Sequence, residues 1–259
     1  MYNRIKELCA YKEMICGLIH RDLRGRYKGS LLGFLWNFLN PVFQIAVYIV
    51  VFSAVFRTGI EKFYVYLLVG IMPWNFFADS LVQGAGCILM ESNLVTKIYF
   101  PREVLPVSLV CSKLIGFLIS YGIVILIMLT GNYGMNLYVI LALPSVIILH
   151  FLFTLGLVLL LSSIDVYFRD FQYMTGILLN ALFWATPVMY SVDMLGSKLR
   201  LLILLNPMTS FISLYQNILY YKVMPSSRQW ALAMVLALFA LVGGEWVFLK
   251  LEKKFAEKL

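Results

Sequence analysis

The side chains that could bind a metal or perform catalysis are few in this 259-residue chain and lie far apart. Its two histidines, His20 and His150, are widely separated, and neither has a metal-ligating neighbour in sequence. The cysteines form no C-x-x-C pair, so their spacing predicts neither a zinc site nor a disulfide framework. They are Cys9, Cys16, Cys87 and Cys111. We therefore expect no metal and no cofactor in this chain.

No G-x-x-x-x-G-K-[ST] loop occurs in the sequence, so the chain does not bind and hydrolyse ATP in the way of P-loop proteins. Asp165 and Asp170 flank Arg169, but a magnesium site for lipid diphosphates would need a further acidic residue nearby. This small cluster is typical of a charged helix end. We expect no catalytic residues, and any energy from ATP must come from a second polypeptide.

The composition is that of an integral membrane protein. Hydrophobic residues make up 62% of the chain, charged residues make up 13%, and the mean hydropathy is +0.87. Soluble domains are only about 45–50% apolar, and a soluble fold would have too little polar surface to cover such a core. The net charge of +8 therefore reports the orientation of the chain in a membrane rather than a nucleic-acid partner.

Apolar runs of about 20 residues can cross a membrane as helices, and they predict an all-α transmembrane domain over residues 33–259. Most Lys and Arg residues outside the apolar runs belong to the pieces that lie on the same side as the two termini. The positive-inside rule then places both termini in the cytoplasm. The six expected spans are about 33–56, 64–86, 104–129, 138–164, 174–190 and 230–249.

Two further segments are expected to be helical without spanning. Residues 1–32 predict a basic amphipathic helix on the cytoplasmic membrane surface, a position compatible with contact to a soluble partner. Residues 197–221 hold two apolar runs that Asn206 and Pro207 separate, and each run is too short to span. They predict either a re-entrant helix pair in the outer leaflet or two helices lying flat on the membrane.

Ionisable residues within the apolar runs would mark a proton or ion relay. Lys113 and Glu245 lie near the cytoplasmic ends of their runs, where snorkelling accounts for them. Asp79 and His150 remain, and two residues are too few for a relay. This pattern disfavours an ion-coupled carrier.

Polar side chains recur at intervals of three and four along the first, second and fifth expected spans, so they form lines on the helices. Inside a bilayer such groups need partners or water. They either hold helices together through hydrogen bonds or line a conduit whose hydrogen-bonding groups and aromatic faces suit a sugar polymer. The candidate conduit residues are Asn37, Asn40, Gln44, Tyr48, Phe52, Trp74, Asn75, Asp79, Gln83, Asn180, Trp184 and Tyr190.

Five short stretches, in order along nearly the whole chain, carry a family resemblance. The sequence resembles the membrane-spanning permease subunit of ABC transporters that export lipid-linked polysaccharides, the group of O-antigen, capsule and teichoic-acid exporters. The first stretch is closest to the O-antigen and capsule members. The stretches are RDLRGRYKGSLLGFLWNFLNP at 21–41, KIYFPREVLP at 97–106, VYFRDF at 166–171, WATPVMYS at 184–191 and LNPMTSF at 205–211.

The resemblance implies a homodimer that forms one pore in the bacterial cytoplasmic membrane. It also implies two copies of a separate ATPase subunit, which bind ATP and magnesium. The exported substrate would be a glycan, O-antigen by closest resemblance, linked to undecaprenyl diphosphate. The alternatives are a permease that exports a drug or a lipid and, less favoured, an ion-coupled carrier.

The same resemblance assigns two groups of site residues. Residues that would couple to the ATPase are Asn93, Lys97, Arg102, Glu103, Arg169 and Asp170. Cationic residues that would attract the lipid diphosphate at the cytoplasmic entrance are Arg24, Arg26, Lys28, Lys97 and Arg102.

Overall fold

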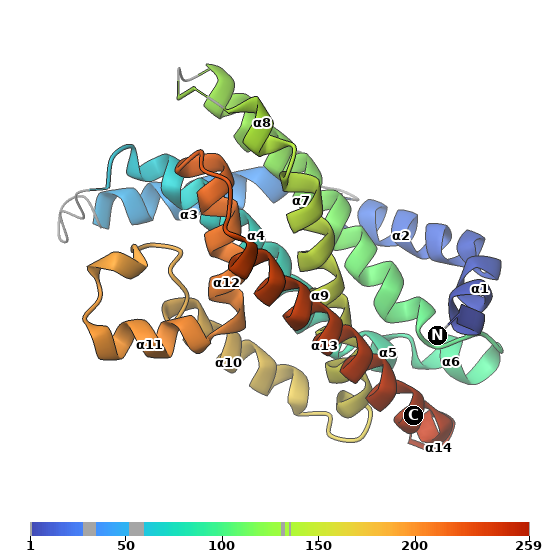
Figure 1. Ribbon diagram of the computed structural model, residues 1–259. Helices are drawn as coiled ribbons and strands as arrows, with labels where there is room; N and C mark the ends of the chain where they lie inside the picture. The colour runs from blue at the N-terminus through green and yellow to red at the C-terminus, as the bar shows by residue number, and fades with distance from the viewer. Residues whose placement is uncertain (1, 28–34, 52–59, 131–132, 135, 259) are drawn as a thin grey trace.

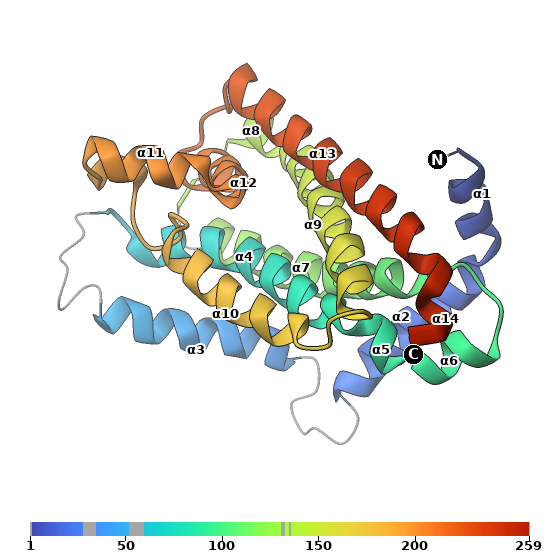
Figure 2. The ribbon, with the colours of Figure 1, turned by 90° about the horizontal axis from the view of Figure 1, so that it is seen from below.

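The computed structural model describes residues 2–27, 35–51, 60–130, 133–134 and 136–258, and these residues contain helices and no strands (Figure 1). Both chain ends lie at the same end of the molecule, the end that also carries α6 (Ser92–Lys97) and α14 (Phe255–Lys258). We call this the terminal end. The opposite end, near α11 (Ser197–Leu205), is called the far end (Figure 2).

Four helices among the described residues are long and apolar enough to cross a membrane. They confirm the helices expected at 64–86, 104–129, 138–164 and 230–249. The third of these begins with a short helix, α8 (Leu137–Ile140), that leads directly into α9. The long helices are α4 (Phe63–Ala85), α7 (Val104–Thr130), α9 (Leu143–Asp165) and α13 (Ser227–Leu251).

The other two expected spans are helical but shorter. Helix α3 (Trp36–Val51) has 16 residues, and the expected range 33–56 extends at both ends beyond the described residues. Helix α10 (Phe171–Trp184) has 14 residues and ends six residues before the expected boundary at 190. Pro187 explains this end, because proline lacks the N–H that a continuing helix would use.

The segment after α10 folds into a chain of short helices. These are η3 (Val192–Met194), α11, α12 (Pro207–Tyr215) and the π-helical turn η4 (Gln216–Tyr220). Asn206 and Pro207 break the helix as expected: Pro207 opens α12, and the Asn206 side chain accepts the first-turn N–H of Met208 at 3.0 Å. Helix α11 is exposed, whereas α12 packs against α4, α9 and α13. The two helices of the expected pair are therefore present at 197–221.

The amino-terminal segment differs from the single amphipathic helix expected at 1–32. It forms α1 (Tyr2–Ala10) and α2 (Lys12–Tyr27), with a turn at Tyr11, and α2 lies against α7. Part of its apolar face packs onto the rest of the protein through Leu8, Met14 and Ile15, whereas Cys9 and Cys16 are exposed.

A separate hydrophobic cluster lies at the terminal end. It joins α5 (Cys87–Met90), α6, the start of α7, the link after α9, and the end of α13 through η5 (Glu252–Lys254) into α14. Its buried members include Ile88, Val95, Phe100, Val166 and Phe255. The cluster packs the two links at the terminal end against the carboxyl terminus of the last long helix.

Helices α9 and α13 make the closest helix crossing in the fold (Figures 1 and 2). A side chain at Gly244 would overlap the backbone oxygen of Gly156, and one at Gly156 would overlap the backbone of Ala240. Small residues recur on this face of α13, with Ala233, Ala237, Ala240 and Gly244 all buried. Close backbone approach at small residues is the usual way in which helices pack in a bilayer.

Gly244→Val should disrupt this crossing. The added side chain meets backbone rather than a flexible side chain, so we expect a destabilisation of about 2 kcal/mol or more and a lower melting temperature of the purified protein in detergent. The neighbouring Gly243 has open space around it and provides the matched control, Gly243→Val. Equal melting temperatures for the two variants would contradict the close crossing.

Candidate functional site

A cavity of about 360 Å³ opens between α3, α4 and α10. Seven of the residues expected to form a conduit line it, together with five small or apolar side chains. The seven are Gln44, Tyr48, Trp74, Asp79, Gln83, Asn180 and Trp184. The polar lines that the sequence places on three separate helices therefore converge on one space.

Aromatic rings and amides alternate around this cavity. The Gln44 amide donates to the Tyr48 hydroxyl at 2.9 Å, and the Tyr48 ring stacks near Phe183 with centroids 6.3 Å apart. The Trp74 ring lies 5.4 Å from Phe183 between centroids, and the Trp184 side chain is 60% exposed. The arrangement offers both ring faces and hydrogen-bonding groups to whatever fills the space.

Three polar residues of the lining are exposed on the surface of this single chain: Asp79, Gln83 and Asn180. Each lies in a helix made mostly of apolar residues. Exposure to hydrocarbon would leave their hydrogen-bonding groups without partners, at a cost of several kcal/mol. The face of α4 and α10 that carries them therefore needs water or another protein surface in front of it.

The remaining conduit candidates lie elsewhere or outside the described side chains. Asn75 is half-buried on α4 and is not part of the cavity lining. Tyr190 lies beyond α10, where its hydroxyl donates to the backbone oxygen of Trp184 at 3.0 Å, so it stabilises the helix end. The side chains of Asn37 and Asn40 in α3, and Phe52 as a whole, lie outside the described residues.

A second cavity, of about 280 Å³, lies at the terminal end between α2, α5, α7 and the start of α10. Its lining includes Arg21, Glu91, Ser108 and Gln172. Gln83 lines this cavity and the first one. The two spaces are therefore neighbours along α4, and together they extend from the terminal end toward the middle of the protein.

The ion pair at the second cavity is a feature that the sequence reading did not identify. Arg21 of α2 pairs with Glu91, which lies between α5 and α6, and its second nitrogen donates to the same carboxylate at 3.3 Å. The neighbouring Asp22 accepts from the Ser112 hydroxyl of α7. The two contacts hold α2 across the mouth of the cavity. The stretch RDLRGR indicated that this region matters, but it could not predict the partners of Arg21 and Asp22. These partners are 70 and 90 residues away in the sequence.

The two links at the terminal end meet at the carboxyl end of α13. Arg102 donates to the backbone oxygen of Glu252 at 3.3 Å, and the Tyr167 hydroxyl donates to that of Leu251 at 3.0 Å. The last carbonyls of a helix have no intrahelical partner and attract donors and cations. One donor from each link therefore caps the same helix end.

Four further coupling candidates are on the surface of the terminal end. Asn93 and Lys97 are exposed on α6, and Arg169 and Asp170 are exposed in the link between α9 and α10. Glu103, by contrast, is buried at the start of α7, with 6% of its surface exposed. Asp165 accepts the backbone N–H of Gln172 at 2.8 Å.

Among the entrance candidates, Arg24 is exposed on α2. The side chain of Arg26 and the whole of Lys28 lie outside the described residues. Cys87, which lines the second cavity, is not a reactive thiol: burial, with the carboxylate of Asp165 nearby, raises the pKa of its thiol well above the usual range.

Two of the stretches that carry the family resemblance contact each other at the far end. The Asn206 amide of LNPMTSF donates to the backbone oxygen of Ala185 at 3.1 Å and to the Thr186 hydroxyl at 2.9 Å, both within WATPVMYS. Gln216 donates to the backbone oxygen of Pro187 at 2.8 Å. These bonds satisfy the carbonyls that the end of α10 leaves open, and they fix α12 beside that end.

Asn206→Ala should remove both the cap of α12 and the two bonds to the end of α10. The expected loss is about 2 kcal/mol, since a cap is removed and a buried carbonyl loses its donor. Asn206→Asp retains the oxygen that caps α12 but replaces the amide donor with a carboxylate oxygen that faces the Ala185 carbonyl, so its melting temperature should also fall below that of wild type. Asn217→Ala, which removes a single bond of 3.3 Å to Gln229, is the control. No difference between Asn206→Ala and this control would contradict the assignment.

The sequence of the chain matches a known protein family. Residues 13–220 match the family of ABC-2 type transporters. An O-antigen export system permease protein, RfbA, of Myxococcus xanthus is 34% identical over 261 aligned positions, which cover all of both chains. A permease protein of the same name in Klebsiella pneumoniae is 28% identical over 95% of each chain. The polysialic acid transport protein KpsM of Escherichia coli is 25% identical over 89% of each chain.

Proposed function

The chain belongs to the family of ABC-2 type transporters, and from this premise we propose that it is the permease subunit of a polysaccharide exporter. The exported substrate is a glycan linked to undecaprenyl diphosphate, with O-antigen the best match to the relatives' names. The protein acts in the bacterial cytoplasmic membrane. A separate ATPase subunit, which binds ATP and magnesium, drives it.

The convergence of three polar lines on one cavity is the observation that carries this proposal. A sugar polymer presents hydroxyl groups along its edges and apolar ring faces, and the lining offers amides from Gln44 and Asn180 beside the rings of Tyr48, Trp74 and Trp184. A drug or lipid exporter would be expected to line its path with apolar side chains. An ion-coupled carrier would need a chain of ionisable groups, and His150 is instead enclosed by the rings of other residues. These are Phe76, Phe77, Phe211 and Tyr215.

The exposed polar face supports a homodimer as the working unit. One chain supplies a cavity open on the side of Asp79, Gln83 and Asn180, and a second copy facing it would enclose a polar path in the bilayer. Intramembrane polar groups commonly face a bundle interior or a water-filled cavity. Each copy would then contribute half of the conduit.

We propose six spans, with α3 and α10 as the first and fifth. An even number of crossings agrees with the two termini lying at the same end of the molecule (Figure 1). The terminal end would face the cytoplasm, where the distribution of Lys and Arg predicts it to lie. The pair α11 and α12 would then enter the outer leaflet at the far end.

The helix end shared by the two links supports a route for coupling to the ATPase. A force on α6 or on residues 166–170 would reach the last turn of α13 through Arg102 and Tyr167. Exposed residues on both links are available to contact a partner: Asn93, Lys97, Arg169 and Asp170. The cavity next to Arg21 and Glu91 would receive the lipid diphosphate, with Arg24 at its approach.

Asn180→Trp should block the conduit. The larger ring would fill part of a cavity of about 360 Å³ between α4 and α10, so surface polymer should fall strongly while the membrane level of the protein is unchanged. Leu178→Trp places the same ring two residues away on the same helix, at an exposed position outside the cavity, and should leave export intact. Equal export by the two variants would contradict the conduit and would indicate that the polar residues only hold the helices together.

Arg102→Ala should uncouple ATP hydrolysis from export. The variant loses a charge-assisted bond to the end of α13, which is worth about 1–2 kcal/mol, and we expect surface polymer to fall while ATP hydrolysis by the complex continues. Arg102→Lys retains the charge and should recover part of the export. Normal surface polymer in Arg102→Ala, at an unchanged membrane level, would exclude this residue from coupling.

A further inference from the structure

Two lysines converge on one tyrosine ring at the far end. The Lys62 ammonium lies 4.9 Å from the centroid of the Tyr133 ring, and the Lys222 ammonium lies 4.2 Å from it. The three residues come from the start of α4, the connection between α7 and α8, and the end of η4. Cation–π contact accounts for one ammonium over a ring, but it does not explain why two like charges are gathered there.

The backbone at both lysines is also unusual. Lys62 has a φ of 47° and Lys222 a φ of 58°, and in the part of the chain that the structure describes they are the only non-glycine residues with positive φ. Such conformations cost free energy for residues with a Cβ and occur preferentially at functional sites. The two residues with this strained backbone in the described part of the chain therefore face the same ring.

These residues line a cavity of about 550 Å³ in which three hydrogen bonds to backbone oxygens join the lining residues. The Lys222 ammonium donates to the backbone oxygen of Tyr133 at 2.5 Å, and the Tyr133 hydroxyl donates to the backbone oxygen of Tyr220 at 3.0 Å. The Tyr220 hydroxyl in turn donates to the backbone oxygen of Glu61 at 2.5 Å. An ammonium has three donors and no acceptor. The described residues give the Lys62 ammonium no hydrogen-bond acceptor. The cavity thus holds two ammonium groups and one carboxylate, that of Glu61, and it suits an anionic ligand that accepts hydrogen bonds from the ammonium groups.

The one carboxylate that lines the cavity, that of Glu61, neutralises only part of this charge. Glu61 is exposed at the rim, and neither lysine forms an ion pair among the described residues. Asp193, next to the lining residue Met194, pairs with Arg200 at 3.3 Å. Two ammoniums against one carboxylate leave the site cationic.

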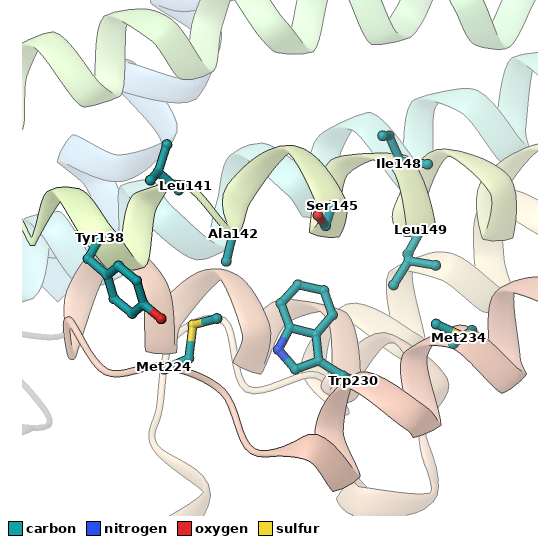
Figure 3. Close-up of a pocket in the computed structure, with 9 residues that line it drawn as sticks. All are labelled: Tyr138, Leu141, Ala142, Ser145, Ile148, Leu149, Met224, Trp230 and Met234. Atoms are coloured by element: carbon teal, nitrogen blue, oxygen red, sulfur yellow. The ribbon is translucent and has the colours of Figure 1, made fainter.

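An apolar groove of about 640 Å³ begins close to this site in sequence (Figure 3). Met224, two residues beyond Lys222, and Tyr138, five beyond Tyr133, lie at one end of it, and Trp230 and Met234 of α13 continue it. The rest of its wall comes from α8 and α9. Helix α8, which carries Tyr138 of the groove, packs against η4, which carries Tyr220 of the cationic cavity. A groove along membrane-spanning helices beside a cationic site has the form of a lipid-binding site.

We propose that Lys62 and Lys222 bind the phosphate headgroup of a lipid whose chain lies along this groove. Phosphate is anionic, accepts hydrogen bonds through all its free oxygens and donates none when fully ionised, as the site requires. The position at the ends of membrane-spanning helices puts the site at headgroup depth. That this lipid belongs to the outer leaflet rests on the proposed function, which places the far end outside.

The position of the two lysines is a second argument. Cationic residues on the outer side run against the usual bias of membrane proteins. Lys62 and Lys222 nevertheless lie on the side proposed as outer, with positive φ angles and with both ammonium groups against the Tyr133 ring. One ligand could therefore contact both ammonium groups. The negative charge of an anionic lipid would reduce the repulsion between the two ammonium groups. It would also account for two cations on the outer side of the membrane.

Lipid retention by the full chain in detergent, measured by native mass spectrometry, tests this proposal. The probes are phosphatidylglycerol, undecaprenyl phosphate and diacylglycerol, which lacks phosphate. We expect the wild type to retain one or both phosphate lipids over diacylglycerol. The double variant Lys62→Gln/Lys222→Gln should weaken that retention by roughly fivefold per lysine removed. The lipid that loses retention identifies the source: a phospholipid or the polyprenyl carrier.

Lys198→Gln/Arg228→Gln removes the same charge from exposed positions outside the cavity and should retain lipid as the wild type does. Lys62→Arg/Lys222→Arg retains both charges and should bind. Equal retention of phosphate lipids and diacylglycerol by the wild type would overturn the proposal, even if the glutamine variant failed to fold. So would equal losses in the glutamine and control variants. The measurement needs no ATPase and no polymer, so its outcome is independent of the conduit test at Asn180.

Discussion

Within a bilayer, a hydrogen-bonding group on an apolar helix has no water as a partner and must find one in protein. The rest of the structure depends on this constraint. At the far end the constraint is met internally: Asn206 and Gln216 donate to the carbonyls that α10 leaves open where it stops. Along α4 and α10 it is not met within one chain, because Gln83 and Asn180 remain exposed. The first group accounts for packing. The second supports the proposed conduit, since unsatisfied polar groups in a bilayer require water or a facing protein.

The same constraint acts on helix ends, and there it links the terminal end to the rest of the fold. The last carbonyls of α13 receive Arg102 from one link and Tyr167 from the other. Helix α13 in turn crosses α9 with backbone against backbone at Gly156 and Gly244. Close-packed contacts of this kind transmit displacement because they have no soft side chains between them. Movement of either link would therefore be carried into two long helices at once.

Much of this architecture could be predicted from sequence, for identifiable reasons. Long apolar runs give four of the spanning helices nearly to the residue, because length and hydropathy are local properties. The lines of polar residues on the second and fifth expected spans were also readable, since the helical repeat places residues three and four apart on one face. Both kinds of signal lie within a single helix.

What could not be predicted depends on contacts between distant segments. The pairing of Arg21 with Glu91 spans 70 residues, and the turn at Tyr11 follows from packing of α1 and α2 onto the cluster at the terminal end. The early end of α10 had a local signal in Pro187, but the apolar residues beyond it obscured that signal. The division of the polar residues also needed the fold: Asn75 and Gln83 share a line on α4, yet only Gln83 joins the two cavities.

The two ends of the protein differ in how their cations are held. Arg21 at the terminal end already has a carboxylate partner, whereas Lys62 and Lys222 have a ring and backbone oxygen. An anion that binds Arg21 must displace Glu91, although the exchange is inexpensive because the Arg21 side chain is 59% exposed and solvent weakens the pair. An anion at the far end displaces no carboxylate from the lysines. The far-end lysines can therefore bind an anion without the exchange of carboxylate partners that Arg21 requires.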